Sequence, residues 1–294
     1  MKLAIAFASL IIATTAAAVQ EQKPLVEHYA AAMVGPVPSS IKVDPFYQKH
    51  ADALGIPILS SPKVPDAALL MARDIVIYML AKRPDFRDAL VKKAWRVGVM
   101  AQTEMTTDIP EHRDRKKPQL GDPRLTEGEK RQYESGTGIA TMTDKEYWDR
   151  RARGLGGNPT TCAEENVLGY PGTRYYGEHI LVHEFAHAIM GGAIREVEPR
   201  LFEGIQAAYK AAMAAGKYRG HYAATNANEY WAEGTQWWFW SNYEETFDGQ
   251  RLQTPDDLKA YDPDLYALLA QVYPGHRIPA DIYHGKNIPP ARRR

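Results

Sequence analysis

The chain has only one cysteine, Cys162, among its 294 residues. A single thiol cannot form an internal disulfide, so the stability of the fold must come from packing or from a bound ion. We expect Cys162 to be a small buried residue rather than a nucleophile or a metal ligand. An excess of charge is also absent, because 36 basic residues balance 36 acidic residues. This balance gives no support to the binding of nucleic acid or of an anionic membrane surface.

Long apolar runs are missing as well, apart from a short one at the N-terminus. Lys2 supplies one positive charge, an apolar stretch follows as far as Ala13, and small residues end at Ala18. This pattern predicts a secretory signal peptide over residues 1–18, since the apolar stretch is too short for a good membrane span. Its removal takes away only Lys2, so 35 − 36 leaves a net charge of about −1. We therefore expect a secreted or periplasmic protein without stable membrane insertion; an uncleaved membrane anchor is the alternative.

The remaining chain is predicted to form an N-terminal arm, residues 19–65, and one domain, residues 66–294. The arm is assigned because residues 19 to about 45 mix Pro, Ser and charged side chains without clear periodicity. Apolar periodicity and helix-breaking residues predict an α+β fold in which helices pack on a small mixed sheet. The predicted helices cover residues 66–81, 85–93, 180–190, 200–215, 228–240, 255–260 and 263–272, the predicted strands 95–101, 138–142 and 165–169, and a long loop 106–136.

The most informative motif is an H-E-x-x-H sequence inside the apolar helix at residues 180–190. Its histidines, His183 and His187, lie four residues apart and therefore share one helix face, where both imidazoles can bind one metal ion. Glu184 lies beside them, in a place to take a proton from a water that the ion activates. Two histidines and a glutamate among apolar side chains need such a reason. His179, one turn earlier, is predicted to be a helix-entry residue.

A third metal ligand has to come from elsewhere, because catalytic zinc usually keeps three protein ligands and one open position. The metzincin pattern is excluded, since Met190 and Ala193 occupy the positions of its glycine and third histidine. A glutamate on a second helix is the remaining solution, and Glu229 is the predicted ligand. Glu233, one turn later on the same face, is predicted to fix the ring of a ligating histidine.

Two alternatives to this assignment remain open. Glu196 and Glu198 follow the first motif closely and are rival ligands, although the chain would have to turn back over few residues. Glu229 and Glu233 also fit a simpler interpretation as surface acids near a helix N-terminus, where the helix dipole favours negative charge.

Residues 222–233, Tyr-Ala-Ala-Thr-Asn-Ala-Asn-Glu-Tyr-Trp-Ala-Glu, resemble the catalytic domain of the anthrax-lethal-factor type of gluzincin. The resemblance covers roughly residues 165–240 and implies a zincin-like fold with the H-E-x-x-H helix at the active-site cleft. It implies that the first Glu of this stretch, Glu229, is the third zinc ligand. It also implies that a tyrosine seven residues earlier (229 − 7 = 222), Tyr222, faces the substrate oxygen. His221 is the alternative for that role.

The sequence and the resemblance together predict a secreted zinc metalloendopeptidase with one Zn²⁺ per chain and Glu184 as general base. The resemblance further implies that an edge strand near residues 165–169 binds a peptide or protein substrate in an extended conformation. Two other functions remain open: a non-catalytic secreted protein that keeps the fold and perhaps the zinc, and a zinc amidase that acts on a non-protein amide.

Overall fold

The computed structural model describes residues 33–122 and 125–279, so the predicted signal peptide at residues 1–18 lies outside the described residues. The described chain contains a mixed sheet in the order β1-β2-β3-β4-β5, in which β1 to β3 are antiparallel and β3 to β5 are parallel. These strands are β1 (Gly35–Pro36), β2 (Lys49–Ala53), β3 (Ile56–Ser60), β4 (Val97–Met100) and β5 (Thr160–Ala163). A separate hairpin pairs β6 (Glu245–Phe247) with β7 (Gln250–Leu252).

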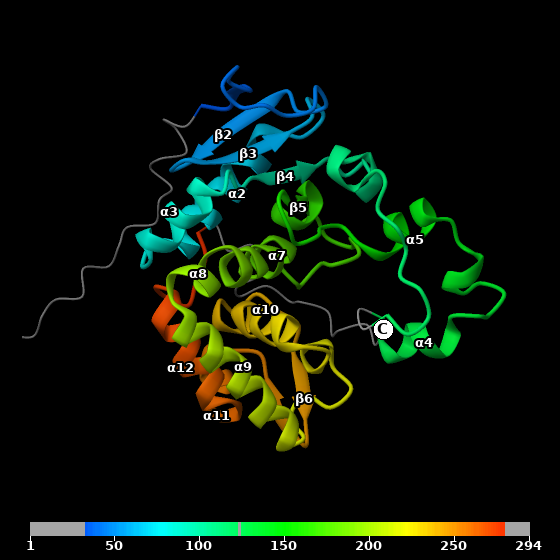
Figure 1. The fold of residues 1–294 in the computed structure, drawn as a ribbon, viewed down its shortest axis with the longest axis vertical. Helices are drawn as coiled ribbons and strands as arrows, with labels where there is room; N and C mark the ends of the chain where they lie inside the picture. Colours follow the sequence, from blue (N-terminus) through cyan, green and yellow to red (C-terminus); the bar gives the residue numbers. More distant parts are fainter. Residues whose placement is uncertain (1–32, 123–124, 280–294) are drawn as a thin grey trace, which may run out of the picture.

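Helices cover one side of this sheet, and further helices form a second layer below them (Figure 1). The helix α7, which carries the H-E-x-x-H motif, lies between the sheet and the group formed by α9 to α12. The α-helices are α2 (Asp66–Met79), α3 (Pro84–Lys92), α4 (Glu127–Gln132), α5 (Asp144–Arg151), α6 (Glu164–Val167), α7 (Ile180–Ala188), α8 (Arg195–Val197), α9 (Pro199–Ala214), α10 (Ala227–Trp238), α11 (Pro255–Tyr261) and α12 (Pro263–Val272). None of the helices in the described ranges is both long enough and apolar enough to cross a membrane.

Short helical turns complete the chain between these elements. A π-helical stretch, Ile189–Ile194, continues α7, and its Gly192 fits against Leu90 and Trp95, where a Cβ atom would clash. The 3-10 turns are Thr106–Asp108, Pro110–His112, Ile139–Thr141 and Tyr222–Ala224.

The main hydrophobic core joins the sheet to α2, α7, α9, α10 and α12. A separate, smaller core lies in the β4–β5 connection, which we define as residues 101–122 and 125–159. Its members are mostly aromatic or aliphatic side chains on α4, α5 and the segments beside them: Leu125, Tyr133, Ile139, Tyr147, Trp148, Ala152 and Leu155. Figure 1 shows α4 and α5 set to one side of the sheet and of the α9–α12 group.

The structure confirms the α+β class, the small mixed sheet and the predicted helices, with ends that differ by a few residues. The strand predicted at residues 95–101 is β4. The N-terminal arm predicted at residues 19–65 contributes β2 and β3, which pair within the main sheet, so residues 49–60 are part of the domain. Ile56 and Ile58 are fully buried there.

Two predicted strands are wrong. Residues 138–142 form a 3-10 turn, because Ile139 turns into the smaller core instead of pairing in a sheet. Residues 165–169 form the end of α6 and a turn, while the strand lies just before them as β5. Glu164 and Glu165 occupy the first turn of α6, where the helix dipole favours acidic side chains, and the β-branched Thr160 and Thr161 lie in the strand.

Candidate metal centre

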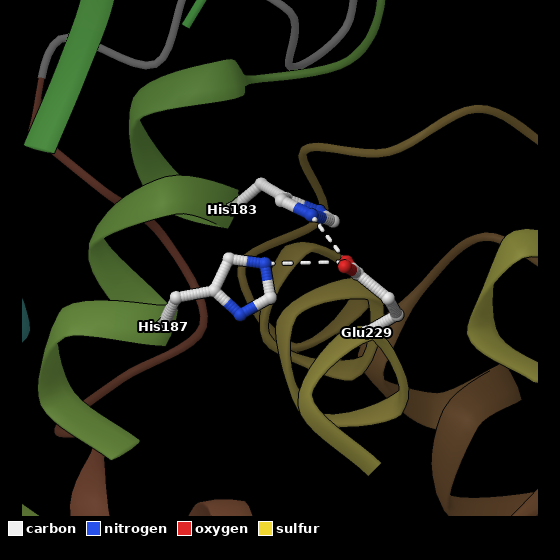
Figure 2. A group of neighbouring side chains, drawn as sticks. All are labelled: His183, His187 and Glu229. Carbon is white, nitrogen blue, oxygen red and sulfur yellow. Dashed lines mark hydrogen bonds and ion pairs between the residues drawn. The ribbon is translucent and has the colours of Figure 1, made fainter. Parts of the chain in front are cut away.

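The histidines of α7 and the glutamate of α10 converge on one point (Figure 2). The Nε2 atom of His183 lies 3.1 Å from Oε2 of Glu229, and the Nε2 atom of His187 lies 3.2 Å from the same oxygen. The two imidazole rings meet edge to face, with centroids 4.9 Å apart. These three side chains form a group whose ligand atoms could hold a metal ion.

The spacing of these atoms fits a small tetrahedral cation. A tetrahedral zinc with bonds of about 2.0–2.1 Å separates its ligand atoms by about 3.3 Å. The two nitrogen–oxygen distances, 3.1 and 3.2 Å, are close to that value. The donor set of two imidazoles and one carboxylate leaves a fourth position open, as in catalytic sites.

Local sequence explains why the two helices hold these groups rigidly. Helix α7 is buried on almost every face, and Leu181, Val182 and Phe185 have no exposed surface. Helix α10 begins at Ala227 because the side chain of Asn226 accepts hydrogen bonds from the N–H groups of the second and third helical residues. This cap fixes Glu229 in the first turn, facing α7.

The ring of His183 is oriented by a residue that the sequence prediction missed. Its Nδ1 atom lies 2.9 Å from Oε1 of Gln236, whereas Oε1 of Glu233 is 3.8 Å away. The amide of Gln236 donates to the carbonyl of His179, so its oxygen faces the ring and accepts the Nδ1 proton. Nε2 of His183 is therefore free to bind an ion. Helical periodicity could have found Gln236, which lies seven residues after Glu229 on the same face.

Glu233 lies next to this hydrogen bond and not in it. Its Oε2 accepts from the Nδ2 amide of Asn242 at 2.6 Å, and the side chain is buried. With Glu178 and His183 it forms a second, fully buried His/Glu group that shares a histidine with the first. The negative charge of Glu233 therefore favours a positive charge on His183.

The charges of the centre complement one another. Burial alone would lower the pKa of His183, but the hydrogen bond to Glu229 and the charges of Glu184 and Glu233 outweigh it and hold that pKa well above its usual value. Burial would raise the pKa of Glu229, but His187 and His183 outweigh it and hold that pKa far below its usual value. The carboxylates thus favour positive charge at the point where the three side chains meet.

Glu184 lies next to Gly156 of the β4–β5 connection. A Cβ atom on Gly156 would come within 3.2 Å of Oε2 of Glu184 and 3.4 Å of Cβ of His187, so only a glycine backbone can approach this closely without a shift. Burial raises the pKa of the Glu184 carboxyl, against the opposing charges of His183 and His187. A carboxylate with raised proton affinity suits a general base.

Tyr222 lies at the same centre. Its hydroxyl donates to Oε1 of Glu229 at 3.2 Å, and its ring stacks on His183 with centroids 6.2 Å apart. Burial and the Glu229 carboxylate raise the pKa of Tyr222, so the phenol keeps its proton. His221 instead packs on Trp237 and Phe247.

The rival ligands lie elsewhere. Glu196 pairs with Lys93 at 2.8 Å and Glu198 pairs with Arg83 at 2.6 Å, both on the surface. Cys162 is fully buried in β5, and burial raises the pKa of its thiol, as expected for a packing residue.

No protein-family model matches the chain, and no curated protein matches it either. The functional argument therefore depends on the geometry of this centre.

Proposed function

We propose that the protein is a secreted zinc metallopeptidase of the gluzincin type, with a zincin-like fold. The observation that carries the proposal is the convergence of His183, His187 and Glu229, with both histidine Nε2 atoms 3.1 and 3.2 Å from one Glu229 oxygen and the carboxyl of Glu184 beside them. A purely structural zinc site usually has four Cys or His ligands and needs no base. Secretion rests on the sequence pattern of residues 1–18.

The residues around the centre have separable roles in the hydrolysis of an amide. Zinc held by His183, His187 and Glu229 would lower the pKa of a bound water toward neutrality and polarise the substrate carbonyl. Glu184 accepts the proton of the attacking water and returns it to the leaving amine. The Tyr222 hydroxyl donates to the oxygen on which negative charge develops.

The substrate edge is assigned to residues 154–157 instead of residues 165–169. The backbone N–H and C=O of Leu155 both bond Thr161 of β5, at 3.3 and 2.9 Å, so this segment runs antiparallel to the strand. In such a pair the neighbouring residues, Gly154 and Gly156, direct their backbone groups to the opposite side. Gly156 lies over Glu184. Gly154 is buried and Gly156 is half-buried, so Gly156 is the residue of this pair that can offer backbone groups to an extended peptide.

The edge is supported from behind by a buried ion pair. Nε and Nη2 of Arg153 bond the two carboxylate oxygens of Glu165 at 2.7 and 3.1 Å. Arg153 also donates to the carbonyl of Ala101 at 3.1 Å. This bidentate contact fixes the start of residues 154–157 against α6.

Metal content of the purified protein, measured by atomic emission, is the direct test. We expect one zinc per chain in the wild type and in Glu198→Ala, which removes a surface carboxylate, and no retained zinc in Glu229→Ala. The wild type should also cleave members of a peptide library. Absence of bound zinc after supplementation refutes the proposal, and zinc without hydrolysis of any amide favours the non-catalytic binding protein. Cleavage of a non-protein amide alone favours the amidase.

A further inference from the structure

The hydroxyl of Thr161 strengthens the contact between β5 and the substrate edge, residues 154–157. Its Oγ1 atom accepts from the N–H of Leu155 at 3.0 Å and lies 3.4 Å from the carbonyl oxygen of the same residue. These contacts add to the two backbone hydrogen bonds of this pair, which is an isolated bridge outside the named strands. One residue earlier in β5, the hydroxyl of Thr160 donates to the carbonyl of Gly157 at 3.0 Å. The edge therefore depends on side-chain hydroxyls of β5 as well as on its backbone.

His112 reaches the hydroxyl of Thr161 from the loop that follows β4. Its Nε2 atom lies 3.1 Å from Oγ1 of Thr161, and the residue is only 4% exposed. The 3-10 turn that ends at His112 is fixed in place, because its N–H donates to the carbonyl of Ile109 at 2.9 Å. Ile109 is fully buried in a small cluster with Met100 of β4 and Ala163 of β5. The imidazole is therefore held against the ends of the two central parallel strands.

The hydrogen bonds of the ring decide how the hydroxyl is oriented. Among the residues that the structure describes, Nδ1 of His112 has no hydrogen-bond partner. Because a buried N–H is seldom left without an acceptor, we assign the ring proton to Nε2, which donates to Oγ1 of Thr161. That oxygen then accepts from both His112 and Leu155, so its own proton is left to point at the Leu155 carbonyl. The ring thus keeps the hydroxyl on both backbone groups of Leu155.

The place of Leu155 sets the place of Gly156, the next residue. The backbone of Gly156 is already so close to α7 that a Cβ atom there would lie 3.2 Å from Oε2 of Glu184. A backbone hydrogen bond to a peptide tolerates only about 2.7–3.2 Å between its heavy atoms. An edge that moves freely must therefore be ordered when the peptide binds, and this ordering lowers the affinity.

We propose that His112 is a positioning residue that holds residues 154–157 ready to pair with an extended substrate, through the hydroxyl of Thr161. The proposal rests on the proposed function, because it takes this edge as the one that binds the substrate. His112 acts through Thr161 and Leu155 and not on the substrate itself.

Two amides of different length test the role of Nε2. The side chain of His112→Gln can place an N–H near the position of Nε2, whereas the shorter His112→Asn reaches only the position of Nδ1. For a peptide that the wild type cleaves, we expect KM to rise about 5-fold in His112→Asn, as for one hydrogen bond. The value of kcat should change little, because the contact holds the edge in the free and in the bound protein. His112→Gln should keep a KM close to that of the wild type.

A double-mutant cycle tests the route through the hydroxyl. Thr161→Val keeps the branched shape and removes the oxygen, so KM should rise at least as much as in His112→Asn. The double variant should be no worse than Thr161→Val alone. Equal KM values in His112→Asn and His112→Gln overturn the proposal, and so do losses that multiply in the double variant.

A second readout requires no turnover. Amide hydrogen exchange followed by NMR should show the Leu155 N–H exchanging about 5-fold faster in His112→Asn than in His112→Gln, although His112 bonds only the Thr161 side chain. The N–H of Thr160, which donates to the carbonyl of Arg96 at 2.9 Å, is the control and should keep its rate in both variants. An unchanged Leu155 rate overturns the proposal. Faster exchange at both amides also overturns it, because the whole sheet has then loosened.

The readouts separate this inference from the proposed function. A wild type without zinc and without hydrolysis refutes the proposed function and the substrate part of this inference together. An active wild type in which His112→Asn changes neither KM nor the exchange of Leu155 refutes this inference alone. Zinc content should stay at one per chain in both His112 variants, and urea unfolding of the two checks that they are folded.

Discussion

The main core and the β4–β5 connection are stabilised by different interactions and serve the centre in different ways. The main core is apolar and aromatic, with Trp231, Trp237 and Tyr218 fully buried, and it carries the candidate metal ligands. The β4–β5 connection has a small core of its own and relies on capping boxes and ion pairs, such as Thr143 with Glu146 and Lys145 with Asp149 at 2.6 Å. In the proposed function it supplies one edge that faces a substrate, residues 154–157. Under that proposal, metal binding and part of the substrate contact rest on separate packing units.

Glu184→Gln should give the largest effect. It separates proton transfer from metal binding, both of which depend on helix α7. The amide cannot accept a proton, so we expect turnover to fall on the order of 10³-fold, within the range for loss of a general base. Zinc content should stay at one per chain, because Glu184 is not among the three converging ligands. Peptide hydrolysis and atomic emission on the same sample check both statements. Turnover within a few-fold of wild type contradicts the role of Glu184.

Replacing one buried tryptophan in each core tests directly whether the main core and the smaller core are independent. Trp231 is fully buried in the main core and stacks on Tyr273, whereas Trp148 is buried in the smaller core beside Tyr147. Trp231→Ala should cost about 4 kcal/mol of global unfolding free energy, since large cavities in a dense core relax poorly. It should also weaken zinc retention.

Trp148→Ala should act mainly on its own unit. We expect zinc retention close to wild type and reduced hydrolysis, because α5 and residues 154–157 lose their packing. Urea unfolding followed by tryptophan fluorescence, zinc analysis and peptide hydrolysis compare the pair. Equal loss of zinc in both variants would show that the two cores form one cooperative unit.

His112 makes the stability of the β4–β5 connection dependent on pH. Burial, and then the charge of Arg115, lower the pKa of His112 from its usual 6.5 to about 4, and its Nε2 lies 3.1 Å from Oγ1 of Thr161. The unfolded chain therefore binds this proton more readily than the folded chain between pH 6.5 and 4. Stability falls as the pH drops through this window, by up to about 3 kcal/mol for this group. In His112→Gln that part of the slope should disappear, as measured by urea unfolding at several pH values; an unaltered slope assigns the loss to other groups.

Asp262 gives a smaller test within the main core. Its Oδ2 accepts from the hydroxyls of Tyr218 and Tyr230 at 3.0 and 2.9 Å, and its Oδ1 caps α12. Asp262→Asn removes the charge while keeping the size, and should cost about 2 kcal/mol because buried hydroxyls lose part of their acceptor. Asp264→Asn, in the exposed first turn of the same helix, is the control. Equal unfolding midpoints for the two variants would contradict the expectation.

Several side chains of the metal centre could be predicted from helical periodicity in the sequence. Side chains that reach the centre through tertiary packing were missed. The i, i+4 spacing depends only on local structure and predicts His183 and His187, whereas Glu229, on a second helix, follows from the need for a third ligand and from the resemblance. Gln236 follows the same period, but a neutral amide carries no charge signal that marks it. The charged neighbour, Glu233, was predicted in its place.

Residues from the β4–β5 connection could not be predicted in the same way. Gly156 lies 27 residues before His183 (183 − 156), in a segment whose position is set by the packing of Trp148 and Leu155. The strand predicted at residues 165–169 lies a few residues after β5, because Glu165 belongs to the first turn of α6.

The lone thiol gives the protein a built-in reporter of local opening. Cys162 is the only cysteine of the chain, and it is fully buried in β5, which packs on the helix of the metal ligands. A thiol reagent added to native protein can react only when this edge of the sheet opens, so its labelling rate measures the free energy of that opening without any engineered probe. A ligand that binds the closed state slows the labelling by mass action, which turns the rate into an affinity scale for metals at this centre.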